Sequence, residues 1–346
     1  MKEIARRANV SIATVDRVIH NRTGVSEKTK AKINAIIEEL DYQPNVLAQR
    51  LALASRGVIR LAVLLPAISA ETEFWQAPLD GVNQAGGEIK QYGVRIQPYF
   101  FDQNDPLSFT EQVKRIQKCK ADGILFSPTF VPQSIELVKD CEKKGIPYVL
   151  INTDLPDHDR LCYIGPELFQ SGYLGAQLVR YCLKDRQKVV LVNIAREIDS
   201  NLAILRKEEG FRTYFKDNPS GHSIVPFNTT RTSYASVSKG LDALFSRERN
   251  IGALFVTNSR VSLVAKWLEK KGLSEVVLLG YDFLQDNVAW LQKGVIDFLI
   301  CEKPQEQGYR GIMSLFQNLV FSTPLEKDYL MPIDIITKEN CRFYRN

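Results

Sequence analysis

The stretch of sequence that decides the fold of the N-terminal part spans residues 2–52 and reads KEIARRANVSIATVDRVIHNRTGVSEKTKAKINAIIEELDYQPNVLAQRLA. Its pattern predicts a first helix over residues 1–8 and a second helix over residues 12–19, with Ser11 as the N-cap of the second. A third helix is expected to begin near Ser26, and its apolar side chains recur at helical spacing, namely Ile33, Ile36, Ile37 and Leu40. Three short helices around a small core are typical of a helix-turn-helix unit.

The second predicted helix has two distinct faces. Its inward positions are apolar and follow the i, i+3, i+4 rule: Val15, Val18 and Ile19. The opposite face is mixed and holds Ile12, Ala13, Asp16 and Arg17. Any short helix has an outer face, so this pattern indicates DNA binding only when it is taken together with the local charge.

Positive charge is concentrated at the same end of the chain. The 346 residues include 45 Lys+Arg and 40 Asp+Glu, which makes the formal net charge +5. Residues 1–60 hold 11 of the basic and six of the acidic side chains, so the whole excess lies in the first sixth of the chain. This asymmetry points to an anionic partner for the N-terminus, because phosphate contacts supply most of the nonspecific affinity for DNA.

The remaining composition is that of an ordinary globular protein, with 45% hydrophobic and 25% charged residues. The length suggests two or three domains. No apolar run approaches the roughly 18–20 residues that a membrane helix needs, and the N-terminus lacks the apolar segment of a secretory signal. The sequence therefore predicts a cytoplasmic protein without membrane contact.

Motifs for metal binding or catalysis are sparse. The six cysteines lie far apart without a Cys-x-x-Cys pair, and the three histidines are isolated, which predicts reduced thiols and no metal site. The sequence has no Gly-x-Gly-x-x-Gly, Walker, Gly-x-Ser-x-Gly or His-Glu-x-x-His motif. We therefore expect neither a cofactor nor enzymatic activity.

Residues 2–52 closely resemble the headpiece of the lac/galactose repressor family of bacterial transcription factors. The resemblance rests on matching residues spread over about fifty positions: Ile4-Ala5, Ala8, Val10-Ser11, Thr14-Val15, Arg17-Val18, Asn21, Val25-Ser26, Thr29, Ile33, Leu40, Tyr42, Pro44-Asn45, Ala48 and Leu51. It implies that the helix over residues 12–19 is a recognition helix, which lies in the major groove of DNA with its N-terminal residues at the base edges.

The resemblance also implies roles for single residues. Ile12 and Ala13 stand at base-reading positions, where they offer only apolar contact, for instance to a thymine methyl group. Arg17 is expected to make a bidentate contact to guanine. Contacts to the DNA backbone are implied for Ser11, Thr14, Asn21, Tyr42 and Asn45, and Arg50 belongs to the same DNA-binding set.

Asp16 departs from the family, in which a serine is usual. Its carboxylate either accepts a hydrogen bond from cytosine N4 or holds Arg17 or Arg22 in place. Residues 45–54 resemble the hinge helix of the family, in which Leu51 would wedge into the minor groove and kink the DNA. The alternative is a linker helix packed on the core. An isolated helix of about ten residues is marginal in water, so we expect this segment to fold on the operator.

From residue 58 the pattern changes to short β-rich runs that alternate with amphipathic helices. The runs cover residues 60–65, 94–101, 123–127, 147–152, 188–194, 223–227, 253–257, 276–281 and 298–301. This alternation is typical of parallel sheets covered on both faces. The expected fold class is an all-α helix-turn-helix headpiece (1–43), a hinge helix and linker (44–57), and an α/β region of two doubly wound parallel-sheet lobes (58–346) that binds an effector and dimerises.

The region from residue 58 resembles, more loosely, a type I periplasmic sugar-binding protein, as the effector domain of the family does. The resemblance rests on short pieces: Glu73-Phe74-Trp75, Gly81, Asp122-Gly123-Ile124, Gly145-Ile146-Pro147, Ser171-Gly172, Gly210-Phe211, Gly280-Tyr281-Asp282 and Pro304 with Gly308. In such folds the ligand lies between the lobes, at the carboxyl ends of the strands.

That location selects polar and aromatic residues near predicted strand ends. Phe74 or Trp75 would stack on a sugar face, and Arg206 would clamp a hydroxyl or a carboxylate. The groups expected to bind ligand hydroxyls are Asp102, Asp154, Asn258 and Asp282. In the family an arginine lies three residues before the glycine of Gly-Phe; here Lys207 has that place, so either Arg206 or Lys207 contacts the ligand.

Together these features predict a transcription regulator, most simply a repressor, that binds a pseudo-palindromic operator in double-stranded DNA as a homodimer. A small-molecule effector would set its DNA affinity. A carbohydrate is favoured by the family and by the aromatic and carboxylate residues, while a nucleobase or another metabolite is an alternative. The competing function from another class is a solute-binding protein without operator binding.

Overall fold

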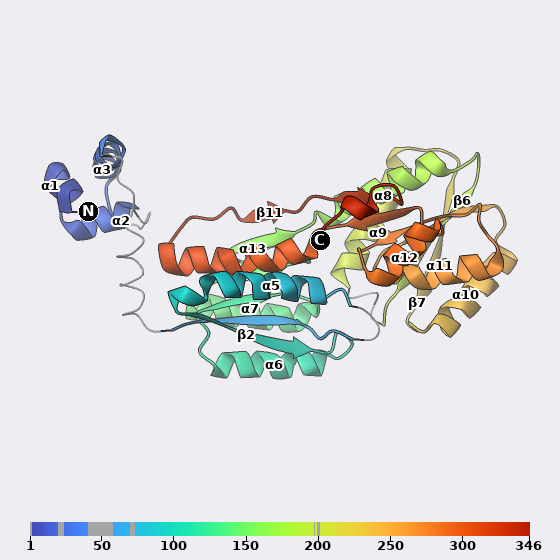
Figure 1. Ribbon diagram of the computed structural model, residues 1–346, viewed down its shortest axis with the longest axis horizontal. Helices are drawn as coiled ribbons and strands as arrows, with labels where there is room; N and C mark the ends of the chain where they lie inside the picture. The colour runs from blue at the N-terminus through green and yellow to red at the C-terminus, as the bar shows by residue number, and fades with distance from the viewer. Residues whose placement is uncertain (1, 20–23, 41–57, 70–72, 197, 199–200) are drawn as a thin grey trace.

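The molecule consists of a small helical unit and two larger lobes. The computed structural model describes residues 2–19, 24–40, 58–69, 73–196, 198 and 201–346. The helical unit lies at one end, and the two lobes follow each other along the long axis (Figure 1). The predicted fold class, a helical headpiece followed by two α/β lobes, is confirmed.

The N-terminal unit contains three short helices: α1 (Lys2–Ala8), α2 (Ile12–Ile19) and α3 (Glu27–Glu39). Its core is apolar and buries Ile4, Ala5, Ala8, Val15, Val18, Ile33 and Ile36. The hydroxyl of Ser11 accepts from the backbone N–H of Thr14, and that of Ser26 accepts from the backbone N–H of Thr29. These caps satisfy first-turn donors that a helix leaves without a partner, so they define where α2 and α3 begin.

Lobe 1 is built on a six-stranded parallel sheet in the order β11-β5-β4-β3-β1-β2. Its strands are β1 (Ile59–Pro66), β2 (Val94–Phe101), β3 (Gly123–Phe126), β4 (Tyr148–Ile151), β5 (Cys162–Gly165) and β11 (Asp328–Leu330). Two helices cover each face: α5 (Gln76–Ile89) and α13 (Pro304–Phe316) on one, α6 (Pro106–Lys118) and α7 (Val131–Lys144) on the other. Because both faces are covered, the inner strands read as unbroken apolar runs.

Lobe 2 repeats this plan with a six-stranded sheet in the order β12-β10-β9-β8-β6-β7. Its strands are β6 (Lys188–Ile194), β7 (Ser223–Thr229), β8 (Ile251–Val256), β9 (Val277–Tyr281), β10 (Phe298–Cys301) and the antiparallel β12 (Asp334–Ile336). One face is covered by α8 (Leu168–Cys182) and α9 (Leu202–Asp217), and the other by α10 (Tyr234–Arg247), α11 (Val261–Lys271) and α12 (Gln285–Lys293).

The chain passes between the lobes three times. It enters lobe 2 between β5 and α8, returns to lobe 1 between β10 and α13, and enters lobe 2 again between β11 and β12. The strands β5, β11 and β12 were not expected from the sequence, because each has only three or four residues and no long apolar run. Three connections between the same two lobes are the arrangement found at hinges between domains.

Each lobe contains one pair of helices in backbone contact. In lobe 2, α8 crosses α9 at Gly172 and Gly210, and a Cβ atom at either position would collide with the facing backbone. In lobe 1, α5 crosses α13 in the same way at Gly81 and Gly308. Glycine is required at these crossings because no side chain fits between the helices.

We expect Gly172→Ala to lower the melting temperature, because overpacking at this crossing would cost about 1–3 kcal/mol. The matched control is Gly87→Ala on α5, where an added Cβ atom meets no atom within 4 Å and alanine favours the helix by up to about 1 kcal/mol. Thermal unfolding followed by circular dichroism measures both. If the Gly172→Ala protein melted at the same temperature as the wild type, the close approach of α8 and α9 would not be needed for stability.

Candidate DNA-binding and effector sites

The outer face of α2 presents the side chains expected to read bases. Ile12 is 46% exposed, and Ala13 and Arg17 are also exposed, whereas Val15 and Val18 are buried in the core of the three-helix unit. The side chain of Ile12 therefore contributes little to the core and remains available for an apolar contact outside it.

Ser11 and Thr14 lie together at the start of α2. Their hydroxyl oxygens are 2.9 Å apart, and Ser11 Oγ accepts from the Thr14 N–H at 3.1 Å. The two hydroxyls and the helix N-terminus make a polar end suited to a phosphate oxygen.

Several predicted DNA-binding groups lie outside the described part of the chain: Asn21, Tyr42, Asn45, Arg50, Leu51 and the side chain of Asp16. Contact with cytosine by Asp16 and the minor-groove wedge of Leu51 therefore stay predictions.

Acidic neighbours hold two arginines of α1. Glu3 accepts from Arg6 at 2.6 Å and from Arg7 at 2.9 Å, and Arg7 also pairs with Glu39 of α3 at 2.8 Å. Hydrogen bonds from the two guanidinium groups lower the pKa of Glu3 to about 2, so the cluster stays ionised at neutral pH. Arg7 thus connects α1 to α3 through its ion pair with Glu39, while Arg17 on α2 remains exposed.

A cleft of about 150 Å³ lies between the lobes at the carboxyl ends of the two sheets. Lobe 1 contributes Phe74 and Trp75, and lobe 2 contributes Lys207, Asn258 and Asp282. The other polar side chains of the lining are Gln103, Ser127, Thr129, Asn152, Thr153, Asn201, Thr257, Ser259, Arg260 and Glu302. The volume is below the roughly 300–1,000 Å³ of pockets for drug-sized ligands, so the cleft suits a small polar molecule.

Phe74 and Trp75 form the aromatic wall of the cleft. Their ring centroids are 5.0 Å apart and their planes are at 89°, an edge-to-face arrangement in which each ring fixes the other. Trp75 is 7% exposed, and Phe74 is the more accessible of the two. The wall therefore offers a rigid apolar surface on which a flat ligand face can stack.

The floor of the cleft contains a buried polar cluster. Lys207 Nζ lies 3.2 Å from Glu302 Oε2 and 3.6 Å from the centre of the Tyr281 ring. Ser171 Oγ donates to Glu302 Oε1 at 2.6 Å and lies 3.2 Å from the Tyr281 hydroxyl. The side chains of Lys207 and Glu302 are 8% and 6% exposed, so this ion pair is removed from bulk water.

Asp282 has an unusual backbone conformation and an unusual titration. Its φ of 75° lies in the left-handed region, and Asn287 Nδ2 holds the turn by donating to the carbonyls of Tyr281 and Asp282, each at 3.0 Å. Burial raises the pKa of Asp282 to about 7; the Lys207 ammonium opposes this rise and the Glu302 carboxylate adds to it. The carboxyl group therefore changes its charge near neutral pH.

Three predicted effector residues lie outside the lining of the cleft. Asp102 accepts a hydrogen bond from a backbone N–H in the turn before α6, at 2.8 Å. Asp154 forms an ion pair with Arg160 at 2.9 Å. Arg206 pairs with Glu209 on the exposed side of α9. Of these two neighbouring residues, the structure thus places Lys207 in the cleft and Arg206 outside its lining, and Arg260 is a second cation of the lining.

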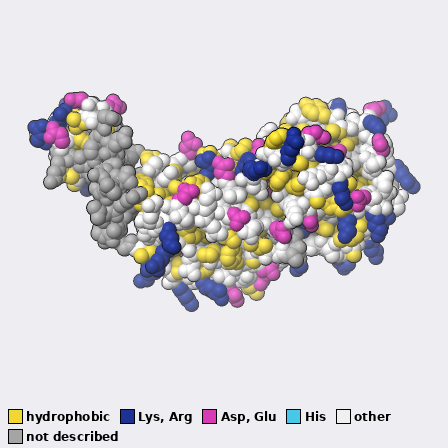
Figure 2. Space-filling model, viewed as in Figure 1, with side chains coloured by type: hydrophobic (Ala, Val, Ile, Leu, Met, Phe, Trp, Pro, Cys, Tyr) yellow, Lys and Arg dark blue, Asp and Glu magenta, His cyan; other side chains and the backbone are white. Residues whose placement is uncertain are grey.

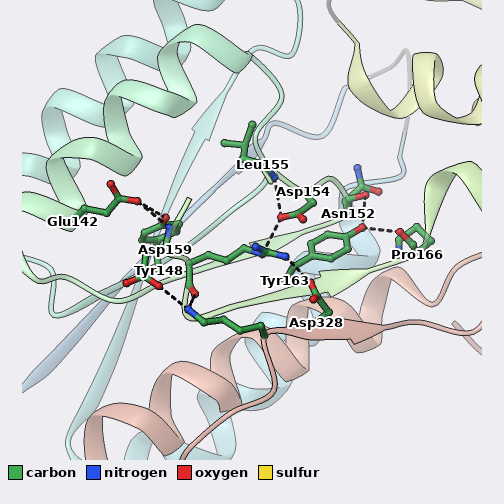
Figure 3. Close-up of polar contacts among 11 residues, drawn as sticks. Glu142, Tyr148, Asn152, Asp154, Leu155, Asp159, Tyr163, Pro166 and Asp328 are labelled. Carbon is green, nitrogen blue, oxygen red and sulfur yellow. Dashed lines mark hydrogen bonds and ion pairs between the residues drawn. The ribbon is translucent and has the colours of Figure 1, made fainter. Parts of the chain in front are cut away.

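The network around Asp154 attaches the edge strand β11 to lobe 1 (Figure 3). Arg160 bridges the carboxylates of Asp154 and Asp328, and Lys327 Nζ pairs with Asp159 at 2.7 Å. Burial raises the pKa of Asp154, and the Arg160 guanidinium opposes that rise. In this arrangement the Asp154 carboxylate holds a strand in place instead of facing the cleft.

Other lining residues were not singled out from the sequence. Ser127 and Asn152 follow β3 and β4 directly, so the strand-end rule that selected Asp282 would have selected them as well. Glu302 follows β10 by the same rule. Its pairing with Lys207, 95 residues away, has no signal in the spacing of the sequence.

Family models match both parts of the chain. The model of the periplasmic binding protein domain matches residues 61–322, and the model of bacterial regulatory proteins of the lacI family matches residues 1–45. The HTH-type transcriptional regulator RegA of Clostridium acetobutylicum is 23% identical, over 99% of this chain and 99% of its own. Catabolite control protein A of Staphylococcus epidermidis is 28% identical, over 45% of this chain and 44% of its own.

Solved structures share the fold of the two lobes. A protein from Bacteroides fragilis assigned to the LacI transcriptional regulators has a TM-score of 0.78 and 27% identity, and the match covers 83% of this chain and all of that chain (100%). A solute-binding protein from Burkholderia graminis in complex with D-arabinose has a TM-score of 0.75 at 20% identity, over 84% of this chain and 99% of its own.

A helix-turn-helix headpiece in front of a two-lobed binding fold defines a class of ligand-responsive DNA-binding regulators, which is a class of transcription factors rather than of enzymes. The chain belongs to the periplasmic binding protein domain family, and its headpiece matches the model of the lacI family of bacterial regulatory proteins. The predicted resemblance is confirmed. In the part of the chain that the structure describes, every helix is too short or too polar to span a bilayer.

We expect Asp282→Asn to stabilise the protein increasingly between pH 5 and pH 7. The pKa of about 7 in the folded state lies above the roughly 3.9 of an unfolded aspartate, so the wild type loses stability as the pH rises through this window, whereas asparagine does not titrate. The difference in unfolding free energy should grow by about 2 kcal/mol and level off above pH 7. Urea unfolding measures it, and a difference that stays constant from pH 5 to pH 7 contradicts the raised pKa.

Proposed function

We propose that this protein is a repressor that binds a pseudo-palindromic DNA operator as a homodimer, and that a small polyhydroxylated ligand between the lobes, a sugar or sugar derivative, sets its DNA affinity. The observation that carries the proposal is the combination, on one chain, of an exposed recognition-type helix face and a cleft lined by Trp75 and Asp282. The DNA-binding half of the proposal is supported by a relative named as a transcriptional regulator. The effector-binding half is supported by the fold that the lobes share with a solute-binding protein in complex with D-arabinose.

In the DNA-binding half, α2 would enter the major groove with Ile12 and Ala13 at its leading end. These side chains would contact thymine methyl groups, and Arg17, more than one turn further along the helix, would donate to guanine O6 and N7. Residues 44–57 would connect the headpiece as a hinge helix that places Leu51 in the minor groove.

In the effector half, the ligand would contact both lobes at once. Phe74 and Trp75 would stack on one face of the ligand, while Asn258 and Asp282 would bind its hydroxyl groups. Contacts to both walls stabilise the closed arrangement of the lobes more than the open one, and this difference in affinity is what shifts the equilibrium. Closure about the three crossovers would then change the spacing of the two headpieces in the dimer.

A second copy of this chain is the partner proposed for the β2 edge of lobe 1. This edge strand exposes Pro98 and Phe100, and Leu107 on the adjacent helix α6 is 74% exposed. Figure 2 shows hydrophobic side chains gathered on the face of lobe 1 that holds β2. An apolar strand edge of this kind is a surface that a partner commonly covers, and a two-fold dimer would present two headpieces to two half-sites.

A solute-binding protein without operator binding is the competing function. The headpiece favours the regulator, because a transport receptor has no use for a helix-turn-helix unit with an exposed recognition helix. A cytoplasmic location in contact with nucleoid DNA, without membrane contact and without a cofactor, is part of the proposal.

The DNA-binding half predicts high affinity at low salt and a steep loss of affinity with rising salt, measured by gel shift on a palindrome selected from random DNA. Arg17→Ala should cost about 1–3 kcal/mol and relax the preference at one base pair. Lys28→Ala, which removes an exposed cation of α3, should weaken binding evenly across sequences. Absence of DNA binding at low salt would overturn the regulator, and a monomer bound to one half-site in sedimentation analysis would overturn the dimer.

The effector half predicts that at least one pentose or hexose raises the melting temperature in a thermal-shift screen, because a ligand that binds only the folded state stabilises it. Trp75→Ala should weaken that ligand by about tenfold, since it removes a stacking wall. Trp290→Ala on α12, which lies outside the cleft, is the matched control and should leave the affinity unchanged. If both variants bound the sugar with equal affinity, Trp75 would not be part of the effector site.

A further inference from the structure

Four charged side chains line the described cleft: Lys207, Arg260, Asp282 and Glu302. Arg260 lies between the cleft and a neighbouring hollow of about 520 Å³, and its guanidinium donates to the carbonyl of Ile194 at 3.1 Å. Lys207 extends from α9 to the floor of the cleft. Whether its ammonium group is paired with a carboxylate of the protein decides whether the floor offers a positive charge to a ligand.

The charge of Lys207 is compensated within the protein. Its ammonium lies 3.2 Å from Glu302 Oε2 and over the Tyr281 ring at 3.6 Å, so one side faces an anion and another side faces a π surface. Only 8% of the Lys207 side chain is exposed. A ligand anion could use this ammonium only by separating it from Glu302, which would leave a buried carboxylate without its counter-ion, and that is strongly unfavourable.

Glu302 is fixed in its pairing position from several directions. Ser171 on α8 donates to Glu302 Oε1 at 2.6 Å, and Gln307 Nε2 donates to the Glu302 main-chain carbonyl at 2.7 Å. The residue follows β10 and precedes α13, so the crossover backbone also restrains it. The ion pair is therefore assembled before any ligand arrives.

Asp282, the second carboxylate of the floor, differs from Glu302 in its hydrogen bonding. It lines the cleft, and within the described residues its carboxylate oxygens receive no hydrogen bond, whereas both oxygens of Glu302 have a partner. With Asp282 ionised, the four charges of the lining cancel, but they are not evenly placed: the Arg260 guanidinium is shared with the neighbouring hollow, whereas Lys207 lies beside Glu302 on the floor. The floor around Lys207 therefore has two carboxylates and a single ammonium. This local excess of negative charge attracts hydrogen-bond donors and cations and repels anions.

We infer that Glu302 sets the charge preference of the cleft: by neutralising Lys207 it makes the site select uncharged or amino-bearing polyhydroxylated ligands and reject sugar acids and sugar phosphates. This inference rests on the proposed effector site and specifies its ligand class. It also separates this chain from a site in which an unpaired cation would bind an anionic group.

The test measures binding of matched monosaccharides to the full-length chain at pH 8 by calorimetry. The probes are D-glucose, D-galactose and D-mannose, each with its 2-amino-2-deoxy form and its uronate. For the stereochemistry that binds, the uronate should be at least about tenfold weaker than the parent sugar, and the amino sugar at least as tight. A uronate that binds the wild type as tightly as the parent sugar overturns the inference and leaves the proposed effector site standing.

Glu302→Gln should release Lys207 and reduce the uronate penalty by about tenfold or more. Glu306→Gln, which removes a carboxylate paired with Arg310 on the same helix, is the isosteric control and should keep the wild-type ratio. The double variant Lys207→Gln/Glu302→Gln removes both charges and should restore the penalty, which separates a charge effect from loosened packing. A folded Glu302→Gln protein with the wild-type ratio contradicts the inference.

Failure of all nine probes to bind the wild type has a different meaning. It overturns a hexose site in the proposed function, and with it the inference that is drawn for such a site. A reversed charge order among bound probes overturns the inference alone, so the two failures are distinguishable.

Discussion

The common direction of the strands is the constraint on which the cleft depends. All six strands of lobe 1 and five of the six in lobe 2 run parallel, so in each lobe the carboxyl ends of the inner strands reach one edge of the sheet. The three crossovers hold these two edges opposite each other. Loops after the strands therefore deliver side chains to one place whatever their distance in sequence, such as Asn152 after β4 and Asp282 after β9.

This constraint also explains how much of the site could be predicted from the sequence. Asn258 and Asp282 follow long buried strands, and both line the cleft. Asp102 and Asp154 follow β2 and β4 by the same rule, yet one is used in a turn and the other in an ion pair with Arg160. A strand pattern predicts where the backbone of such a residue lies. The partners of its side chain come from elements elsewhere in the chain, which the local pattern does not predict.

The choice between Arg206 and Lys207 depended on the rotation of α9. Successive residues of a helix point about 100° apart, so only one of the two can face inward. Lys207 lies three residues after the buried Ile204 and four before the buried Phe211, which is the spacing of an inward stripe. The periodicity of α9 would have selected Lys207. Its partner Glu302 required the tertiary structure, because the pair joins two segments 95 residues apart.

The position of this pair relates the cleft to the hinge. Glu302 begins the crossover between β10 and α13, and the next residue, Lys303, has a left-handed φ of 52° and reaches to 3.3 Å from Asp334, just past the third crossover. A buried ion pair adds little net stability compared with apolar packing, but losing one partner is costly. The segment about which the lobes turn is therefore sensitive to any group that alters the pairing of Lys207. A ligand shifts a conformational equilibrium only through a difference in its affinity for the two states, and in the proposed function the charges shared by cleft and crossover would supply such a difference.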